Sequence, residues 1–181
     1  SYPGMGLVDI GANLGVYTLM AAACGERVLA VDMQDSNILH LQHSLQQSNL
    51  SSQVSTVISL STLHRNNSAR SYIVENSKGT DTVQSVCLDD LMPLVSFPNV
   101  FLKIDLANTE HHVLVCGQEF FTRISVRVVQ VKWGRKRPEI ANWIGNFMHH
   151  YNYTSSVLID NVYHLWDVRF SNWAGDVFFF K

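Results

Sequence analysis

A glycine-rich turn placed directly after an apolar run is the feature that most constrains how this chain can fold. Leu7–Ile10 is a short apolar run, and the segment Gly11-Ala12-Asn13-Leu14-Gly15 follows it at once. Glycine adopts backbone angles that other residues avoid, and it lets a ligand or a second backbone approach closely. A buried strand that ends in such a turn and opens a helix is typical of Rossmann-like α/β domains. The pattern therefore predicts a parallel sheet with a ligand site at the turn.

The rest of the chain alternates between predicted strands and predicted helices, which favours crossover connections in a parallel sheet. Further strands are expected at Arg27–Val31, Val54–Leu60, Ser71–Val74, Val83–Leu88, Val100–Ile104, Val126–Val131, Ser156–Ile159, Val162–Trp166 and Val177–Phe180. Helices are expected at Leu14–Cys24, from a Ser36 cap to about Gln47, from a Thr109 cap to about Cys116, and from Pro138 through Glu139–His149. The last strands follow one another without helices, so we expect an antiparallel hairpin to close the sheet.

Length and composition favour one α/β domain that spans residues 1–181. The chain has 181 residues, 46% of them hydrophobic, and a formal net charge of -2. No apolar run reaches the roughly 18 residues that a membrane span needs, so we expect no membrane contact from this segment. The chain runs almost directly into its first strand, which suggests a domain cut from a longer protein.

The cysteines and glycosylation triplets leave the compartment unassigned. Cys24, Cys87 and Cys116 lie in apolar stretches without zinc-ligand spacing, so we expect buried reduced thiols. Asn-x-Ser/Thr triplets begin at Asn49, Asn66 and Asn152. A chain rich in Asn, Ser and Thr contains such triplets by chance, so they do not establish secretion.

Two acids flank the glycine-rich turn and define the kind of ligand that it favours. Asp32 ends the second predicted strand, 17 residues after Gly15, where an acid can accept hydrogen bonds from ribose hydroxyls. The three-glycine pattern that seats a pyrophosphate is absent, and Asp9 adds a negative charge nearby. A nucleoside with a cationic or amine end therefore fits better than a dinucleotide. A tight turn without a ligand is the alternative.

These residues resemble the FkbM-type methyltransferases, which use S-adenosylmethionine (SAM). The resemblance rests on Val8-Asp9-Ile10-Gly11-Ala12-Asn13-Leu14-Gly15-Val16-Tyr17-Thr18, on the Leu88-Asp89-Asp90 segment, and on Phe101-Leu102-Lys103-Ile104-Asp105 followed by Glu110. It covers roughly residues 7–133. It implies a class I methyltransferase fold with a seven-stranded, mostly parallel sheet and helices on both faces. It also implies SAM as methyl donor, bound by Asp9, Gly11, Ala12, Asn13, Gly15, Asp32 and Asp105, and usually a hydroxyl oxygen as acceptor.

The chain departs from the family pattern at two places. Ala107-Asn108 stands where the family usually has Glu-Gly, and Lys132 stands where the family commonly has an acid. These departures favour an alternative, a catalytically silent module that binds SAM or a protein partner. The retained ligand turn counts against that alternative. A nicotinamide-dependent oxidoreductase is a third interpretation. The absence of a third glycine and the presence of Asp9 both argue against it.

The candidate catalytic residues are Asp105, Lys132 and Lys103. Asp105 follows a central strand at the edge where ligands bind in open α/β sheets, so it is the candidate general base. Lys103 lies two residues earlier and faces the same side, where it can pair with Asp105 or Asp9. Lys132 is a candidate to lower the pKa of an acceptor hydroxyl or to bind an anion. For Glu110, an anchoring role in the following helix is expected.

The acceptor is a hydroxyl-bearing molecule that the sequence does not identify. Arg135-Lys136-Arg137 is the only basic cluster, and it makes an RNA backbone a candidate partner, with a solvated loop as the alternative. Trp133 beside it is a candidate to stack on a base or sugar, or a core residue. The eight histidines show no metal spacing, so no metal is expected.

Overall fold

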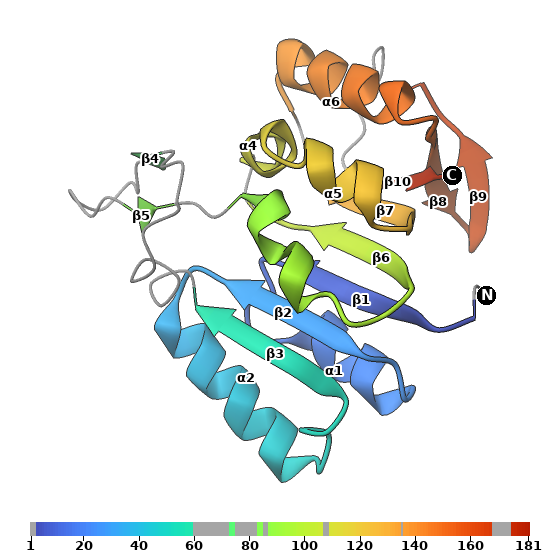
Figure 1. Cartoon of the computed structure of the whole chain (residues 1–181). Helices are drawn as coiled ribbons and strands as arrows, with labels where there is room; N and C mark the ends of the chain where they lie inside the picture. Colours follow the sequence, from blue (N-terminus) through green and yellow to red (C-terminus); the bar gives the residue numbers. More distant parts are fainter. Residues whose placement is uncertain are drawn as a thin grey trace.

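The computed structural model describes residues 3–59, 73–74, 83–84, 87–106, 109–134, 136–167 and 175–181. One central sheet of eight strands organises these residues, in the order β3-β2-β1-β6-β7-β10-β8-β9 (Figure 1). Its strands are β1 (Met5–Ile10), β2 (Val28–Asp32), β3 (Val54–Ser59), β6 (Asn99–Ile104), β7 (Val126–Lys132), β8 (Thr154–Ile159), β9 (Val162–Leu165) and β10 (Asp176–Phe180).

The strand directions confirm a mostly parallel sheet that ends in antiparallel strands. β1 pairs in parallel with β2 and β6, β2 with β3, and β6 with β7. β8 and β9 form an antiparallel hairpin. β10 lies between β7 and β8 and is antiparallel to both, so it fills a gap that the chain first leaves open. Seven strands match the sheet that the family resemblance implies, and β9, which corresponds to the expected strand Val162–Trp166, is the eighth at the edge.

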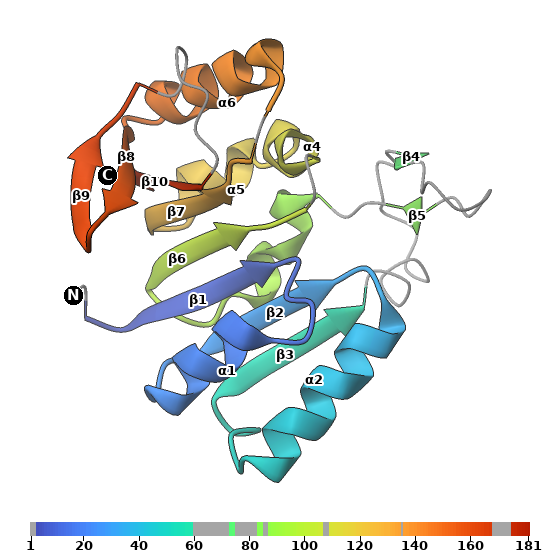
Figure 2. The same ribbon diagram turned by 180° about the vertical axis from the view of Figure 1, so that it is seen from behind.

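Helices cover both faces, as Figures 1 and 2 show from opposite sides. On one face, α1 (Val16–Ala23) and α2 (Asp35–Gln47) bury Ala22, Leu41 and Leu45 against Leu7, Val28 and Ala30. On the other, α4 (Glu110–Val115), α5 (Gln118–Arg123) and α6 (Pro138–His150) pack on the larger core. Along β1, β2 and β6 the side chains alternate between the two cores, as the pleat requires. Within the described residues, no helix combines the length and apolarity needed to cross a membrane.

The segment between β3 and β6 differs from the expected strands. β4 (Ile73–Val74) and β5 (Val83–Gln84) form a separate two-stranded antiparallel sheet. The expected strand Val83–Leu88 was too long, because Leu88 begins the 3-10 helix η2 (Leu88–Leu94). Asp90 accepts a hydrogen bond from the Cys87 N–H at 3.3 Å, and Leu88 and Leu91 point into the core three residues apart. Leu60, Ser71 and Tyr72, which belong to other expected strands, lie outside the described residues.

Of the two expected helix caps, Ser36 was wrong, whereas Thr109 is the N-cap residue of α4 but makes no side-chain capping hydrogen bond. α2 begins at Asp35 rather than after Ser36, and Asp32, not Ser36, accepts the N–H of Gln34 at 2.9 Å. Thr109 precedes α4, but its hydroxyl donates backwards to the Leu106 carbonyl at 2.6 Å.

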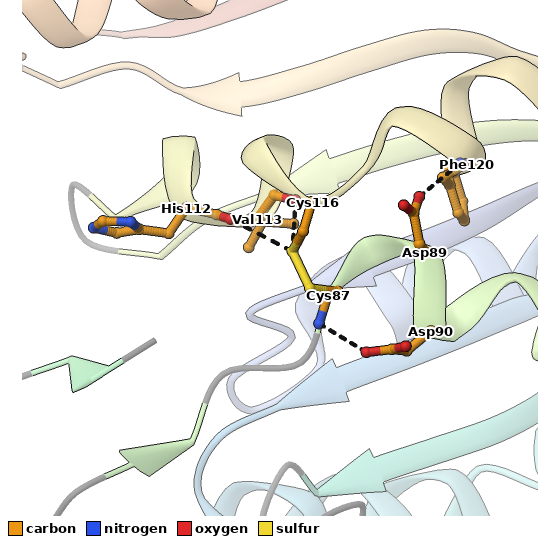
Figure 3. Close-up of a disulfide and its surroundings, with 7 residues drawn as sticks. All are labelled: Cys87, Asp89, Asp90, His112, Val113, Cys116 and Phe120. Carbon is orange, nitrogen blue, oxygen red and sulfur yellow. Dashed lines mark hydrogen bonds between the residues drawn. A yellow bond between two sulfur atoms is a disulfide. The ribbon is translucent and has the colours of Figure 1, made fainter. Parts of the chain in front are cut away.

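The expectation of three buried reduced thiols was wrong. Cys87 and Cys116 form a disulfide with a Cα–Cα distance of 5.2 Å, and Cys24 is exposed (Figure 3). The bond joins the residue before η2 to the residue after α4, 29 positions apart. Asp89 supports the same junction because its carboxylate accepts the Phe120 N–H at 2.7 Å. Sequence spacing missed the pair because packing of η2 against the α4–α5 junction brings the two residues together.

Candidate functional site

The candidate site lies at the topological switch point of the sheet. From β1 the chain proceeds outward through β2 to β3, and it then crosses to β6 on the other side of β1. The loops after β1 and β6 consequently diverge, and such a crevice is where open α/β sheets bind ligands. Gly11 follows β1 and Asp105 follows β6, and the Asp105 N–H donates to the Ile10 carbonyl at 3.0 Å.

The glycine-rich turn is held in a left-handed backbone conformation. Gly11 has φ 77°, Asn13 52° and Gly15 89°. A Cβ atom on Gly11 would lie 2.0 Å from the Asp105 carbonyl oxygen, and one on Gly15 would lie 2.2 Å from Leu41 Cδ1. At Gly11 the backbone angle and the Asp105 carbonyl both require glycine, whereas at Gly15 the angle favours glycine and the Leu41 side chain would have to shift to admit a Cβ. The turn thus presses the end of β1 against β6 and seats α1 against α2.

Asp9 and Lys103 form a buried ion pair beneath the turn. The Lys103 ammonium donates to Asp9 Oδ1 at 2.8 Å and to the Gly11 carbonyl at 3.1 Å. The Thr18 hydroxyl donates to the other Asp9 oxygen at 2.8 Å. The side chains of Asp9 and Lys103 are 0% and 5% exposed. Lys103 therefore stabilises the turn from below and pairs with Asp9, one of the two partners expected for it, while its expected catalytic role stays a prediction.

Asp32 ties the glycine-rich turn to the beginning of α2. Its Oδ2 accepts the Asn13 N–H at 2.8 Å, and its Oδ1 accepts the Gln34 N–H and the Asn37 amide at 2.9 and 3.0 Å. A carboxylate oxygen has two lone pairs, so Oδ2 has capacity for one more donor. A ribose hydroxyl would have to use that position.

Asp105 and Lys132 form a partly exposed pair at the carboxyl ends of β6 and β7. The Lys132 ammonium donates to Asp105 Oδ2 at 3.2 Å. The side chains are 31% exposed for Asp105 and 59% for Lys132, so both reach solvent. The hydrogen bond to the Asp105 carboxylate, followed by its charge, raises the pKa of Lys132. Lys132 is consequently a stable cation at this edge and cannot act as a base near neutral pH.

In the basic cluster Arg135-Lys136-Arg137 after β7, Lys136 is buried in an ion pair. The Lys136 ammonium donates to Glu110 Oε2 at 2.7 Å, and both side chains are 1% exposed. Glu110 Oε1 also accepts the Leu106 N–H at 3.3 Å, so this pair holds the loop after β6, as expected for Glu110. The Lys136 ammonium is therefore enclosed rather than exposed to a partner, and RNA as a partner of the Arg135-Lys136-Arg137 cluster stays a prediction. Arg135, Ala107 and Asn108 lie outside the described residues.

Trp133 is a core residue rather than a stacking platform. It is 1% exposed and packs on Phe179, with ring centroids 6.2 Å apart. The Lys136 ammonium lies 5.7 Å from its ring centroid, on the core side of the loop.

Sequence reasoning missed a polar network next to Asp9 and Lys103. The Gln130 amide donates to the Tyr17 hydroxyl at 3.0 Å and to Asp176 at 2.7 Å. The Tyr17 ring lies 4.9 Å from the Lys103 ammonium. Gln130 interrupts the β-branched run of β7, and a polar residue inside an apolar strand was the signal that could have revealed the network.

The geometry fits a nucleoside ligand, and nothing among the described residues forms a metal centre. No group of three or more His, Cys, Asp or Glu side chains is arranged to hold a metal ion within the described ranges. The described ligand-side groups are the backbone of the glycine-rich turn, the Asp32 carboxylate, and the Asp105–Lys132 pair.

Comparisons with known proteins define the class of fold. No protein-family model matches the chain. No curated protein sequence is similar to it. Solved structures of methyltransferases superpose over nearly the whole chain. Precorrin-6y C5,15-methyltransferase from Geobacter metallireducens has a TM-score of 0.54 and 12% identity over 98% of this chain and 80% of its own.

Two further structures support the same class. The methyltransferase domain of bacterial CtHen1 has a TM-score of 0.54 and 11% identity over 97% of this chain and 90% of its own. The METTL16 methyltransferase domain has a TM-score of 0.54 and 11% identity over 99% of this chain and 60% of its own. The chain therefore has the Rossmann-like fold of the class I SAM-dependent methyltransferases. At these identities the likeness defines the fold alone.

Proposed function

We propose that the chain is a SAM-dependent O-methyltransferase of the FkbM type. The observation that carries the proposal is the Asp105–Lys132 pair, a carboxylate and an ammonium 3.2 Å apart at the switch point. It lies beside a glycine turn so close to β6 that a Cβ on Gly11 would meet the Asp105 carbonyl. A ligand in the turn would thus have an acid and a cation next to it.

The residues around the turn fit SAM. Asn13 and Leu14 are exposed at the tip of the turn, where a ligand can reach the backbone. Asp32 Oδ2 keeps one acceptor position for a ribose hydroxyl. Asp9 does not supply the exposed negative charge that the sequence suggested, because Lys103 neutralises it. Asp105 is a partly exposed acid at this edge that can face the cationic end of SAM.

The chain's own residues would orient and deprotonate the acceptor. SAM, when bound, supplies an activated methyl group. The Asp105 carboxylate would accept the proton that the acceptor hydroxyl loses on methylation. Lys132, kept protonated by Asp105, would hold the carboxylate in place and favour the oxyanion that develops on the acceptor.

A sugar or small-molecule hydroxyl suits the acceptor role better than an RNA ribose. In the basic loop, the Lys136 ammonium is buried and paired with Glu110, so it does not face a ligand. Lys136 therefore adds no positive charge to a surface that could bind an RNA phosphate backbone.

Replacing Asp32 by alanine should weaken SAM binding while the domain stays folded. Loss of a charge-assisted ribose hydrogen bond costs about 1–3 kcal/mol, or roughly five- to 150-fold in Kd. Titration calorimetry with SAM and S-adenosylhomocysteine measures this, with the thermal midpoint as a check on folding. Asp35→Ala, three residues further at the start of α2, is the matched control and should bind normally. Equal affinity of both variants would remove Asp32 from the cofactor site.

Replacing Asp105 by asparagine should reduce turnover of the SAM-bound domain by about 100-fold or more, the usual contribution of a general base, and should weaken SAM binding far less, because only one charge facing SAM is lost. Asparagine keeps the shape and can still accept a hydrogen bond from Lys132 through its carbonyl oxygen. The measurement follows labelled methyl transfer from SAM to a panel of hydroxyl-bearing sugars, small alcohols and capped RNA. Normal turnover in Asp105→Asn would reject the assigned base.

A catalytically silent module is the second candidate, favoured by Lys132 at a position where FkbM enzymes commonly carry an acid. It predicts that SAM or a protein partner binds while no acceptor in the panel is methylated. A folded domain that binds neither SAM nor S-adenosylhomocysteine would reject the enzyme and favour a protein-binding scaffold.

A further inference from the structure

The disulfide carries information about the compartment in which the domain folds. Cys87 and Cys116 are paired at a Cα–Cα distance of 5.2 Å, well inside the range that a disulfide requires. The pair lies between η2 and the α4–α5 junction, outside the candidate site (Figure 3). Structural disulfides form and persist in oxidising environments such as the secretory lumen and the cell exterior. In those compartments, exposed Asn-x-Ser/Thr triplets are acceptors for glycans.

The two triplets within the described residues occupy equivalent places in the fold. Asn49 follows the last residues of α2 with φ 56°, and Asn152 follows those of α6 with φ 64°. Asn49 and its Ser51 are exposed, and so are Asn152 and its Thr154. Each acceptor amide thus stands on a tight turn at the surface.

Both turns lie at the edge of the sheet opposite the candidate site. α2 and α6 each start after the carboxyl end of a strand and run back to the amino end of the next one (Figure 1). Their last turns, with Asn49 and Asn152, are therefore next to the starts of β3 and β8. Glycans there would not cover Asp32 or Asp105.

We propose that the domain matures in an oxidising secretory compartment and carries N-linked glycans at Asn152 and Asn49. In the transfer, the side-chain amide nitrogen bonds to the anomeric carbon of a lipid-linked oligosaccharide. The bond from that carbon to the diphosphate oxygen breaks, and the amide loses one proton as the lipid diphosphate leaves. The Cys87 and Cys116 thiols give two electrons and two protons to a disulfide-donating oxidant, which ends as a dithiol.

The first test uses the protein isolated from the cells that naturally make it. Enzymatic removal of N-glycans should increase its electrophoretic mobility and convert Asn49 and Asn152 to aspartate in the peptide map. Under denaturing conditions without reductant, one of the three cysteines, Cys24, should react with a thiol reagent, and all three should react after reduction. Unmodified Asn49 and Asn152, or three reactive thiols before reduction, would overturn the proposal.

A second test assigns the sites by expressing the chain through a eukaryotic secretory pathway. Thr154→Ala removes the acceptor triplet without placing a longer side chain at the positive-φ Asn152, and should remove one mobility step. Thr154→Ser keeps the triplet and is the matched control. Ser51→Ala and Ser51→Thr form the same pair for Asn49. If Thr154→Ala and Thr154→Ser, or the Ser51 pair, migrate identically at the wild-type position, that site is not modified and the proposal fails there. None of these residues belongs to the candidate site, so the outcome is independent of the methyltransferase assignment.

Discussion

The Lys103→Met variant should lose about 3–5 kcal/mol of unfolding free energy, because it leaves the Asp9 carboxylate buried without its cation. Asp9 is fully buried, and only the Thr18 hydroxyl would remain as a described partner. The Gly11 carbonyl would also lose its bond from Lys103. Methionine fills a similar volume, so the effect reports charge rather than a cavity.

Lys132→Met is the matched control for this experiment. It also replaces a paired lysine by methionine, but the Lys132 side chain is 59% exposed. Exposed ion pairs contribute about 0–1 kcal/mol. Urea unfolding measures both variants. The double variant Asp9→Leu/Lys103→Met should recover part of the loss, since no unpaired buried charge remains. Equal small losses in both single variants would mean that Asp9 is not held as a buried anion by Lys103.

The Gly11→Ala variant should lose about 2–5 kcal/mol, the sum of a strained left-handed backbone and an unavoidable collision. Its φ is 77°, and the new Cβ would lie 2.0 Å from the Asp105 carbonyl oxygen. That oxygen belongs to the backbone, so the ends of β1 and β6 would have to separate. SAM binding should fall as well, because the turn and Asp105 would move apart.

Gly25→Ala separates the two contributions of the Gly11 substitution. Gly25 has φ 82°, nearly the angle of Gly11, and nothing lies within 4 Å of its would-be Cβ. Its loss should be only the backbone cost, roughly 1–2 kcal/mol, with normal SAM binding. Denaturant unfolding and calorimetry test both variants. A loss in Gly11→Ala no larger than in Gly25→Ala would show that the turn has room for a side chain.

The local elements of the fold could be predicted from the sequence, whereas pairings between distant segments could not. The glycine turn predicted β1 and α1, and Pro138 indicated the first residue of α6. The sequence also indicated Asp105 at a strand end. It could not indicate that β10 inserts between β7 and β8, because this strand order depends on which strand edges remain unpaired when β10 docks.

The candidate site shows the same division. Alternation along β6 placed Lys103 and Asp105 on one face, but the packing of Tyr17 and Thr18 above Asp9 enclosed Lys103. Lys136 looked like part of a basic loop, and it became buried because Glu110 enters the same space from α4. In both cases a charge that looks exposed in sequence is neutralised by a partner at least 26 residues away.

What the sequence by itself determined is the fold class and the place of the ligand edge. Periodicity and turn chemistry act over a few residues, so the glycine turn and the strand-end acids Asp32 and Asp105 are visible in it. Only the tertiary structure decided the pairings of Lys103 with Asp9, Lys132 with Asp105, and Cys87 with Cys116. These pairings depend on which surfaces the sheet brings together, and the burial that results determines whether a charge binds, reacts or holds the fold.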